Sequence, residues 1–181
     1  SIDIYDMIIG DKNGIMLAAR ILGYGKDYEF TFDGENQVAD LSILEPVDID
    51  FTQLIKGKNE FEFTLPATER HITFKLLTGR DEREISTEIE ARKKINKQHS
   101  SELTTRLKKM ILSVDGKFQK VYINNFVDNE FLSRDSLAFR KYLATISPDV
   151  DMNTTVVDST GKESVVTIPI TVRFFWPTAG V

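Results

Sequence analysis

The chain has 181 residues, of which 41% are hydrophobic and 28% are charged, a composition typical of a folded protein rather than a disordered or low-complexity one. It contains no cysteine, which excludes a disulfide scaffold, a cysteine-ligated zinc or iron–sulfur site and a thiol nucleophile. The formal net charge of −5 disfavours nucleic acid as a general partner, because binding phosphates requires a surplus of cations.

Near the N-terminus the pattern predicts a helix followed by a hairpin. A short apolar run begins after Asp11, a residue type that caps helices, and ends at a glycine, so we expect a helix over residues 12–22. Residues 28–32 and 37–41 then flank Asp33-Gly34, a dipeptide that accommodates the positive φ of a tight turn. These two segments are therefore predicted to pair as antiparallel strands.

A clearer alternation of polar and apolar residues predicts a central hairpin. It covers residues 60–65 and, after a short connector, residues 70–76. A repeat of two is typical of β-strands, whose successive side chains point to opposite faces. The apolar side chains expected to face the core are Phe61, Phe63, Leu65, Ile72, Phe74 and Leu76.

The pattern becomes helical at Thr78. The segment Thr78-Gly79-Arg80-Asp81 is typical of a helix N-terminus, because a hydroxyl caps free backbone N–H groups and an acidic residue suits the first turn. Apolar residues within 103–114 also have helical spacing. We expect these two helices to form a hairpin with a turn at residues 97–101. A third helix is predicted near residues 121–127 and a fourth near 137–146.

The C-terminal part returns to a repeat of two. Residues 153–157 and 166–174 are predicted to pair as strands, with Pro169 at a sheet edge or a bulge because proline lacks an amide donor. The order of helix, strands, helices and strands fits an α+β fold and not the βαβ alternation of nucleotide-binding parallel sheets. We therefore predict a single α+β domain over residues 1–181, with a helical insert of about four helices over residues 78–147.

Catalytic chemistry has little support in the sequence. The glycine spacings of phosphate-binding loops and of the serine-hydrolase nucleophile elbow do not occur. Two Asp-x-Asp pairs could each hold Mg²⁺ if both carboxylates pointed the same way, although both pairs lie in predicted loops, where turn and capping roles are common. They are Asp48 with Asp50 and Asp149 with Asp151. We predict no catalytic residue, no metal site and no cofactor, and keep a metal-dependent enzyme as an alternative.

One region of the chain is basic. Residues 79–109 carry nine basic and six acidic side chains, in a chain that is acidic as a whole. The cations that we single out as partner-binding candidates are Arg92, Lys93, Lys94 and Lys97. Such a cluster can dock onto an acidic protein surface or contact nucleic acid, and it can also be a solvated helix face that only serves solubility.

An aromatic cluster near the C-terminus offers a second candidate surface. The segment Phe174-Phe175-Trp176-Pro177 places bulky side chains on both faces of the predicted strand. Only one face can point into a one-sided core, so Phe175 and Trp176 are candidates for binding a partner. The alternative is a strand that is buried on both faces.

Several short segments, in a fixed order along most of the chain, resemble one protein family. They are residues 24–30, 40–41, 61–66, 74–82, 106–111, 126–127, 135–136, 140–143 and 148–151, and the terminal Phe174-Phe175-Trp176-Pro177. In this order and spacing they resemble the T4-type bacteriophage baseplate hub assembly family. The resemblance implies a non-enzymatic structural or assembly subunit of a contractile tail, found in the virion baseplate and, during assembly, in the host cytoplasm.

The resemblance also implies the partners of such a subunit. It predicts contacts with other hub, spike or tape-measure proteins, and symmetric copies of this chain that form a homo-oligomer or ring. A transient tail-assembly chaperone that is absent from the mature virion is the alternative. No run of about 18 apolar residues occurs, so no membrane partner is predicted.

Members of this family often carry a Cys-x-x-Cys turn in each of the two terminal hairpins. Four thiolates of this kind suggest a zinc knuckle that joins the N- and C-terminal parts. In this chain Phe32 and Glu35 occupy the first pair of positions, and Val157 and Thr160 occupy the second. The resemblance thus implies that the two hairpin regions pack together without zinc, with Phe32 and Val157 as candidates for the contact that replaces the metal.

Overall fold

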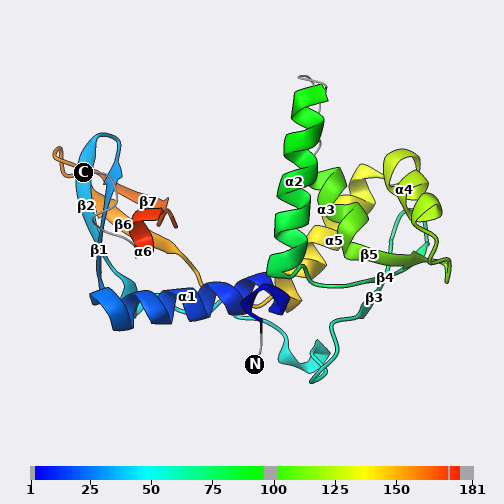
Figure 1. Ribbon diagram of the computed structural model, residues 1–181, viewed down its shortest axis with the longest axis horizontal. Helices are drawn as coiled ribbons and strands as arrows, with labels where there is room; N and C mark the ends of the chain where they lie inside the picture. Colours follow the sequence, from blue (N-terminus) through cyan, green and yellow to red (C-terminus); the bar gives the residue numbers. More distant parts are fainter. Residues whose placement is uncertain (1–2, 96–101, 171, 176–181) are drawn as a thin grey trace. The chain divides into compact units, whose positions relative to one another are not determined.

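The protein is described by a computed structural model (Figure 1). The described residues are 3–95, 102–170 and 172–175. They form helices and antiparallel strands in separate stretches of the chain, so the predicted α+β class is confirmed.

Contacts divide the chain into two compact units. The central unit comprises residues 1–9 and 48–147, and the terminal unit comprises residues 10–47 and 148–181. Each unit contains both helices and antiparallel strands. The predicted insert of residues 78–147 belongs to the central unit, while a single domain over the whole chain stays a prediction.

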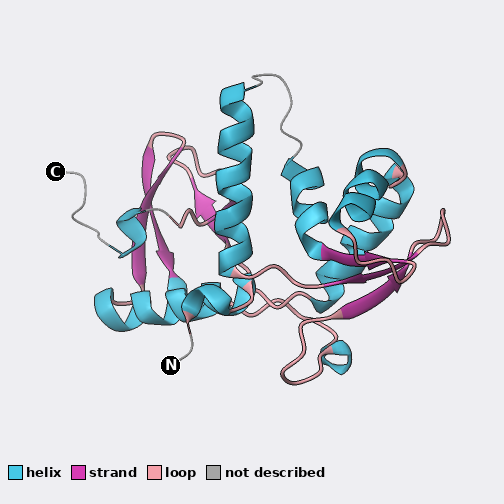
Figure 2. Ribbon diagram, turned by 45° about the vertical axis from the view of Figure 1, so that its right-hand side comes forward, coloured by secondary structure: helices cyan, strands magenta, loops and turns pink. Residues whose placement is uncertain are grey.

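The central unit contains a three-stranded antiparallel sheet, drawn among the magenta strands of Figure 2. Its strands are β3 (Phe61–Thr64), β4 (His71–Phe74) and β5 (Ile111–Val114), in the order β3-β4-β5. Phe63 lies opposite Ile72, which in turn lies opposite Val114. The predicted central hairpin is therefore confirmed, and it gains a third strand on the β4 side.

Four helices follow the central hairpin, as the sequence predicts. They are α2 (Gly79–Ile95), α3 (Glu102–Met110), α4 (Lys120–Asn129) and α5 (Ser133–Ile146). The predicted start of α2 is confirmed, because the backbone N–H of Thr78 donates to the Asp81 carboxylate at 3.0 Å and the N–H of Asp81 donates to the Thr78 hydroxyl at 3.3 Å. Short 3-10 helices cover Ile4–Asp6, Leu41–Ile43 and Phe51–Gln53.

The second predicted helix is too long. It was expected to run through residue 114, but α3 ends at Met110 and the chain continues as β5. Pairing with β4 explains the difference, because Ser113 lies opposite Thr73 and the two hydroxyl oxygens are 2.7 Å apart. Apolar residues spaced for a helix face can equally fill a strand when a free sheet edge is present.

Aromatic side chains dominate the core of the central unit. Phe74 lies at 4.8 Å from Phe139 in an edge-to-face arrangement, and Phe63 stacks on Tyr142 at 4.8 Å between ring centres. The residues of this core with no exposed surface are Leu65, Ile72, Phe74, Ile111, Val114, Ile123, Phe126, Phe139 and Ile146. Strands β3 to β5 and helices α3 to α5 therefore share one apolar core.

The terminal unit combines one long helix with two hairpins. Its elements are α1 (Ile9–Tyr24, which begins one residue before the unit), β1 (Asp27–Phe32), β2 (Glu35–Asp40), β6 (Asn153–Val157), β7 (Glu163–Thr167) and α6 (Val172–Phe175). The turn between β1 and β2 has φ of 51° at Asp33 and 83° at Gly34, as expected for Asp-Gly in a hairpin. The predicted N-terminal helix and hairpin are thus confirmed, with a helix longer at both ends.

The last predicted strand is only partly right. Strand β7 pairs with β6 as expected, but it ends at Thr167 instead of reaching residue 174. The N–H of Ile168 still donates to the carbonyl of Met152 at 2.8 Å, and Pro169 then has no N–H with which to extend the ladder. Residues 172–175 form the short helix α6 instead.

The two terminal hairpins share one apolar core. It includes Tyr28 and Phe30 of β1, Val156 of β6 and Val166 of β7, all of which are buried. Phe174 of α6 closes this core, with its ring edge-to-face on Tyr28 at 5.1 Å. An isolated two-stranded hairpin is at best marginally stable in water, so each hairpin depends on the surface that the other covers.

Candidate functional site

The turns of the two terminal hairpins are joined by hydrogen bonds. The Glu35 carboxylate accepts from the backbone N–H of Ser159 at 3.0 Å and from its hydroxyl at 2.5 Å. The side-chain amide of Gln37 donates to the carbonyl of Val157 at 3.3 Å. Residues more than 100 positions apart therefore meet at the ends of β2 and β6.

The β6–β7 turn is shaped by Asp158. Its carboxylate accepts from the Thr160 hydroxyl at 2.6 Å and from the backbone N–H of Lys162 at 3.0 Å, and Gly161 has a φ of 83°. The hydrogen bond from Thr160, followed by the one from the Lys162 backbone, lowers the pKa of Asp158. This local network presents Ser159 to Glu35.

The four residues at the predicted zinc-knuckle positions have different surroundings. Glu35 makes the bonds between the turns, whereas Thr160 bonds within its own turn. Phe32 packs against the terminal core, while the Val157 side chain is 52% exposed and only its carbonyl takes part. The sequence suggested an apolar contact between the turns, but the observed contact consists of hydrogen bonds. The sequence did not point to Ser159 and Gln37, which donate these bonds. That this contact stands in for a zinc knuckle stays a prediction.

Removing the Glu35 carboxylate should weaken the contact between the turns. We expect Glu35→Ala to lower the free energy of unfolding by about 1 kcal/mol, since two donors on Ser159 lose a charged acceptor at a partly exposed site. Urea unfolding followed by circular dichroism measures the change. The matched control is Glu29→Ala on β1, an exposed residue, for which a change below about 0.5 kcal/mol is expected. Equal losses in both variants would contradict a stabilising role for Glu35.

An arginine that the sequence reading missed ties α1 to β1. Arg20 is 4% exposed, and its guanidinium donates to the carbonyls of Gly25 at 2.9 Å and Asp27 at 3.2 Å. It also lies over the rings of Tyr24 and Tyr28, at 5.2 and 5.7 Å from their centres. The signal in the sequence was a single cation within an otherwise apolar helical run, which indicates a buried position with backbone partners.

The stability of the terminal unit should depend on pH in the acid range through Asp40, which lies at the end of β2. The hydrogen bond from Lys26 at 2.6 Å, with further bonds from Ser42, lowers the pKa of Asp40 from 3.8 to about 2. A carboxyl with a lowered pKa stabilises the fold above its unfolded pKa, and this contribution is lost as the pH falls toward 2. We expect carbon NMR to place the Asp40 midpoint near 2.

The matched variants for this titration change one lysine at a time. Lys26→Gln should move the Asp40 midpoint up toward 3.8, because the largest cause of the shift is removed. Lys162→Gln, in the other hairpin, should leave it unchanged. An Asp40 midpoint that does not respond to Lys26→Gln would contradict the assignment.

The predicted basic cluster is described only in part. Arg92 forms an ion pair with Glu88 at 2.5 Å, and Lys94 is exposed on α2. The side chain of Lys93 is not among those described, and Lys97 lies outside the described residues. Partner binding by Arg92, Lys93, Lys94 and Lys97 therefore stays a prediction.

Neighbouring carboxylates form ion pairs with several other cations of this region. Arg106 of α3 pairs with Glu82 of α2 at 2.5 Å, and Lys108 pairs with Asp128 of α4 at 2.6 Å. Lys109 also pairs with Glu84 of α2. The basic character of residues 79–109 is therefore reduced by contacts that hold α2, α3 and α4 together.

The predicted aromatic surface is likewise only partly described. Phe175 is half-buried, with its ring edge-to-face on Phe174 at 5.1 Å. Phe174 has no exposed surface. Trp176 lies outside the described residues, so partner binding by Phe175 and Trp176 stays a prediction.

Three of the four Asp-x-Asp residues accept local hydrogen bonds at caps and turns. Asp50 accepts from the backbone N–H and hydroxyl of Thr52 at 3.0 and 2.5 Å, and Asp151 accepts from the backbone N–H of Asn153 at 3.0 Å. Asp149 accepts from its neighbour Val150, while Asp48 is exposed. Within the described part of the chain no group of three or more histidine or acidic side chains could hold a metal ion.

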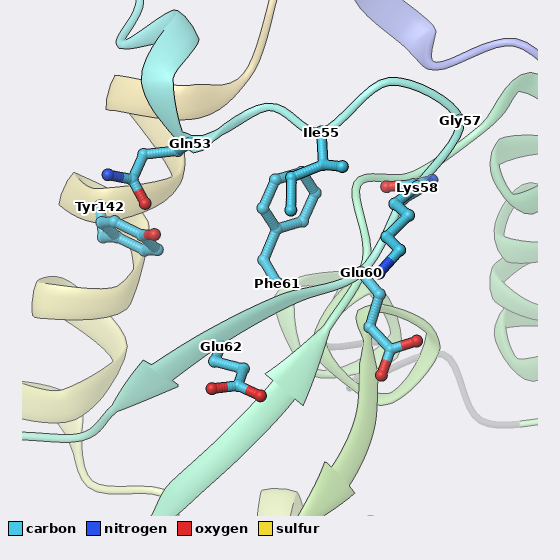
Figure 3. A pocket seen from close by; sticks show the side chains of 9 residues that line it. Gln53, Ile55, Gly57, Lys58, Glu60, Phe61, Glu62 and Tyr142 are labelled. Carbon is cyan, nitrogen blue, oxygen red and sulfur yellow. The ribbon is translucent and has the colours of Figure 1, made fainter.

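A hollow of about 680 Å³ opens beside β3 in the central unit (Figure 3). Its lining includes Gln53 and Tyr142, which lie on one side in this view, and Lys58 and Glu60 on the other. Asn59 secures the loop, because its side-chain amide donates to the Leu76 carbonyl and its oxygen accepts from the Leu76 N–H, both at 2.8 Å. No feature of the sequence pointed to this hollow.

Comparisons with known proteins add no relative. No family model, no curated protein and no solved structure matches the chain. Among the described residues, no helix is long and apolar enough to cross a bilayer.

Proposed function

We propose that this protein is a structural or assembly subunit of the baseplate hub in a contractile bacteriophage tail, and that it acts through protein–protein contacts. The starting point is the ordered set of segments that resembles the T4-type hub assembly family. Its partners would be other hub, spike or tape-measure proteins, together with symmetric copies of this chain.

The observation that carries the proposal is the contact between the two terminal turns. The resemblance picks out residues 32–35 and 157–160 as two ends of one junction, although more than 100 residues separate them. Glu35 and Ser159 are hydrogen-bonded within these segments, and the hairpins behind them share one core. Local patterns in the sequence give no reason for these turns to meet, so their meeting supports the resemblance.

The outward faces of the hairpins supply surface for such contacts. Val38 on β2, Val157 on β6 and Val165 on β7 are 62%, 52% and 73% exposed. Each hairpin is a two-stranded sheet, so strand edges with free backbone groups are also present. Exposed apolar side chains beside open strand edges are common at protein interfaces and allow a partner strand to add to the sheet.

The test is to interrupt the coding sequence in the phage that encodes this chain and to examine the particles. We expect electron microscopy of the interrupted phage to show tails without complete baseplates, and a plasmid copy of the wild-type protein to restore them. Mass spectrometry of purified wild-type virions should then find the protein at a fixed copy number relative to the tail tube. Normal baseplates without the protein would overturn the proposal.

Two alternatives give different results in the same experiment. A transient assembly chaperone would be required for assembly and absent from purified virions. A metal-dependent enzyme using the Asp-x-Asp pairs would fail to complement after conversion to asparagine of Asp48, Asp50, Asp149 and Asp151. A structural subunit is expected to tolerate these changes at exposed positions.

A further inference from the structure

A small hollow lies between α5 and the turn that joins β3 to β4. Its volume is about 340 Å³. It is lined by Pro66 and Ala67 of the turn and by Arg134, Leu137, Ala138 and Lys141 of α5. Positions 134, 137, 138 and 141 fall on one face of a helix, so the hollow follows the helix axis. Leu137 is 48% exposed, which leaves a large apolar side chain open in the floor.

The two walls of this hollow are fixed to each other by Asp135. This residue has no exposed surface, and its carboxylate accepts from the backbone N–H of Ala67 at 2.7 Å. It also accepts from the backbone N–H and the hydroxyl of Thr68, at 3.1 and 2.7 Å. The hollow is therefore preformed, so a ligand would not have to order the turn when it binds.

The rim of the hollow is positively charged. Arg134 and Lys141 line it, and both are exposed. No carboxylate of the described residues forms an ion pair with either of these two cations, whereas the α3 cations Arg106 and Lys108 are paired.

The nearby acidic residues do not line the hollow. The lining contains no acidic residue. The carboxylate of Asp135 is buried and occupied by three hydrogen bonds, and Glu69, at the far end of the turn, does not line the hollow. The chain as a whole has a net charge of −5, so cations without carboxylate partners beside an apolar side chain indicate that the hollow binds an acidic ligand.

We propose that this hollow, with Arg134 and Lys141 in its lining, is a docking site for an acidic peptide segment of a partner protein. One apolar side chain of the segment would contact Leu137 and Pro66, and flanking aspartates or glutamates would pair with the cations. Guanidinium groups suit this task because they bind carboxylates through two parallel hydrogen bonds. The exposed leucine favours a peptide over a nucleic acid or a lipid headgroup, whose charged groups leave an apolar floor uncovered.

The site is built from residues other than the predicted partner-binding ones, and it does not depend on the assignment to a phage baseplate. Its test is a selection from a displayed library of random peptides of about twelve residues on the immobilised full chain, at ~50 mM salt, where screening is weak. We expect enrichment of sequences that combine several acidic residues with one or two large apolar residues.

Variants of the chain then test whether the selected peptide binds at this hollow. For a selected peptide we expect the double variant Arg134→Glu with Lys141→Glu to raise the Kd by at least about tenfold, and Leu137→Ser by at least about threefold. The control double variant, Lys56→Glu with Lys120→Glu, carries the same change in net charge at exposed sites of the same unit and should change the Kd less than about twofold. Raising the salt to ~300 mM should weaken binding to the wild-type chain.

Several results would overturn the proposal. They are a selection that yields no peptide, enriched peptides without an acidic excess, and binding that the α5 variants leave unchanged. Phosphatidylglycerol vesicles and a short DNA duplex are probed in parallel. Binding of either one that is lost in the α5 double variant, with no acidic peptide enriched, would assign the cations to a membrane or a nucleic acid instead.

Discussion

Replacing Asp135 by alanine is expected to lower the free energy of unfolding of the central unit by about 3 kcal/mol. The carboxylate has no exposed surface and accepts three hydrogen bonds from Ala67 and Thr68. Alanine would leave three donors without their charged acceptor, and because Ala67 is exposed and Thr68 is half-buried, we expect a cost of about 1 kcal/mol for each lost hydrogen bond. The variant would also lose an acidic side chain from the first turn of α5.

Urea unfolding and hydrogen exchange together test this prediction. Exchange of the Ala67 and Thr68 amide protons should become faster in the variant than that of the core amides of β4, because the turn loses its tether. Asp135→Asn should have a smaller effect, since the amide keeps one acceptor oxygen. The matched control is Asp128→Ala on α4, which breaks a surface ion pair with Lys108 and should cost no more than about 1 kcal/mol. Equal effects at the two positions would contradict the buried anchor.

Elements whose sequence signal lies within or next to the element itself could be predicted from the sequence. The central hairpin follows from alternation, the N-terminal hairpin from Asp33-Gly34, and the start of α2 from Thr78 and Asp81. In each case the signal lies within a few residues of the structure that it predicts. These elements are formed by backbone preferences and short-range hydrogen bonds, which do not depend on distant parts of the chain.

The two errors in the fold arise where a distant partner decides the structure. The Ile111–Val114 segment has apolar residues that suit either a helix or a strand, and the free edge of β4 makes it a strand. Residues 172–175 were expected to extend β7, but Pro169 interrupts the ladder, and Phe174 reaches the core from a short helix. Both outcomes depend on which surface is available, and a local pattern does not contain that information.

The candidate sites show the same limit for side chains. Position 35 was singled out by the resemblance, but its partner Ser159 was not, because the alignment of two turns depends on the packing behind them. Asp135 reads in the sequence as an ordinary acidic residue in the first turn of a helix. Its function as an anchor for the 67–68 backbone exists only once β3, β4 and α5 are in place.

The last prediction concerns a position where backbone meets backbone. Gly10 is buried in the first turn of α1, and a Cβ atom built on it would lie 1.6 Å from the carbonyl oxygen of Pro148 and 2.9 Å from the Cα of Asp149. Neither neighbour can rotate away, because both are main-chain atoms. The 148–150 segment is itself held, since the N–H of Val47 donates to the Asp149 carbonyl at 2.9 Å.

We therefore expect Gly10→Ala to lower the free energy of unfolding of the terminal unit by about 3 kcal/mol, at the upper end of the cost of overpacking. This loss should exceed the gain of ~1 kcal/mol that alanine brings to a helix interior. Two glycines of the same helix give matched controls for urea unfolding. Gly14→Ala meets only a Val150 methyl at 3.8 Å and Gly23→Ala meets nothing within 4 Å, so both should be neutral or stabilising. If Gly10→Ala were as stable as Gly14→Ala, α1 and the 148–150 segment could not be in direct backbone contact, and the packing of the terminal unit around α1 would have to be revised.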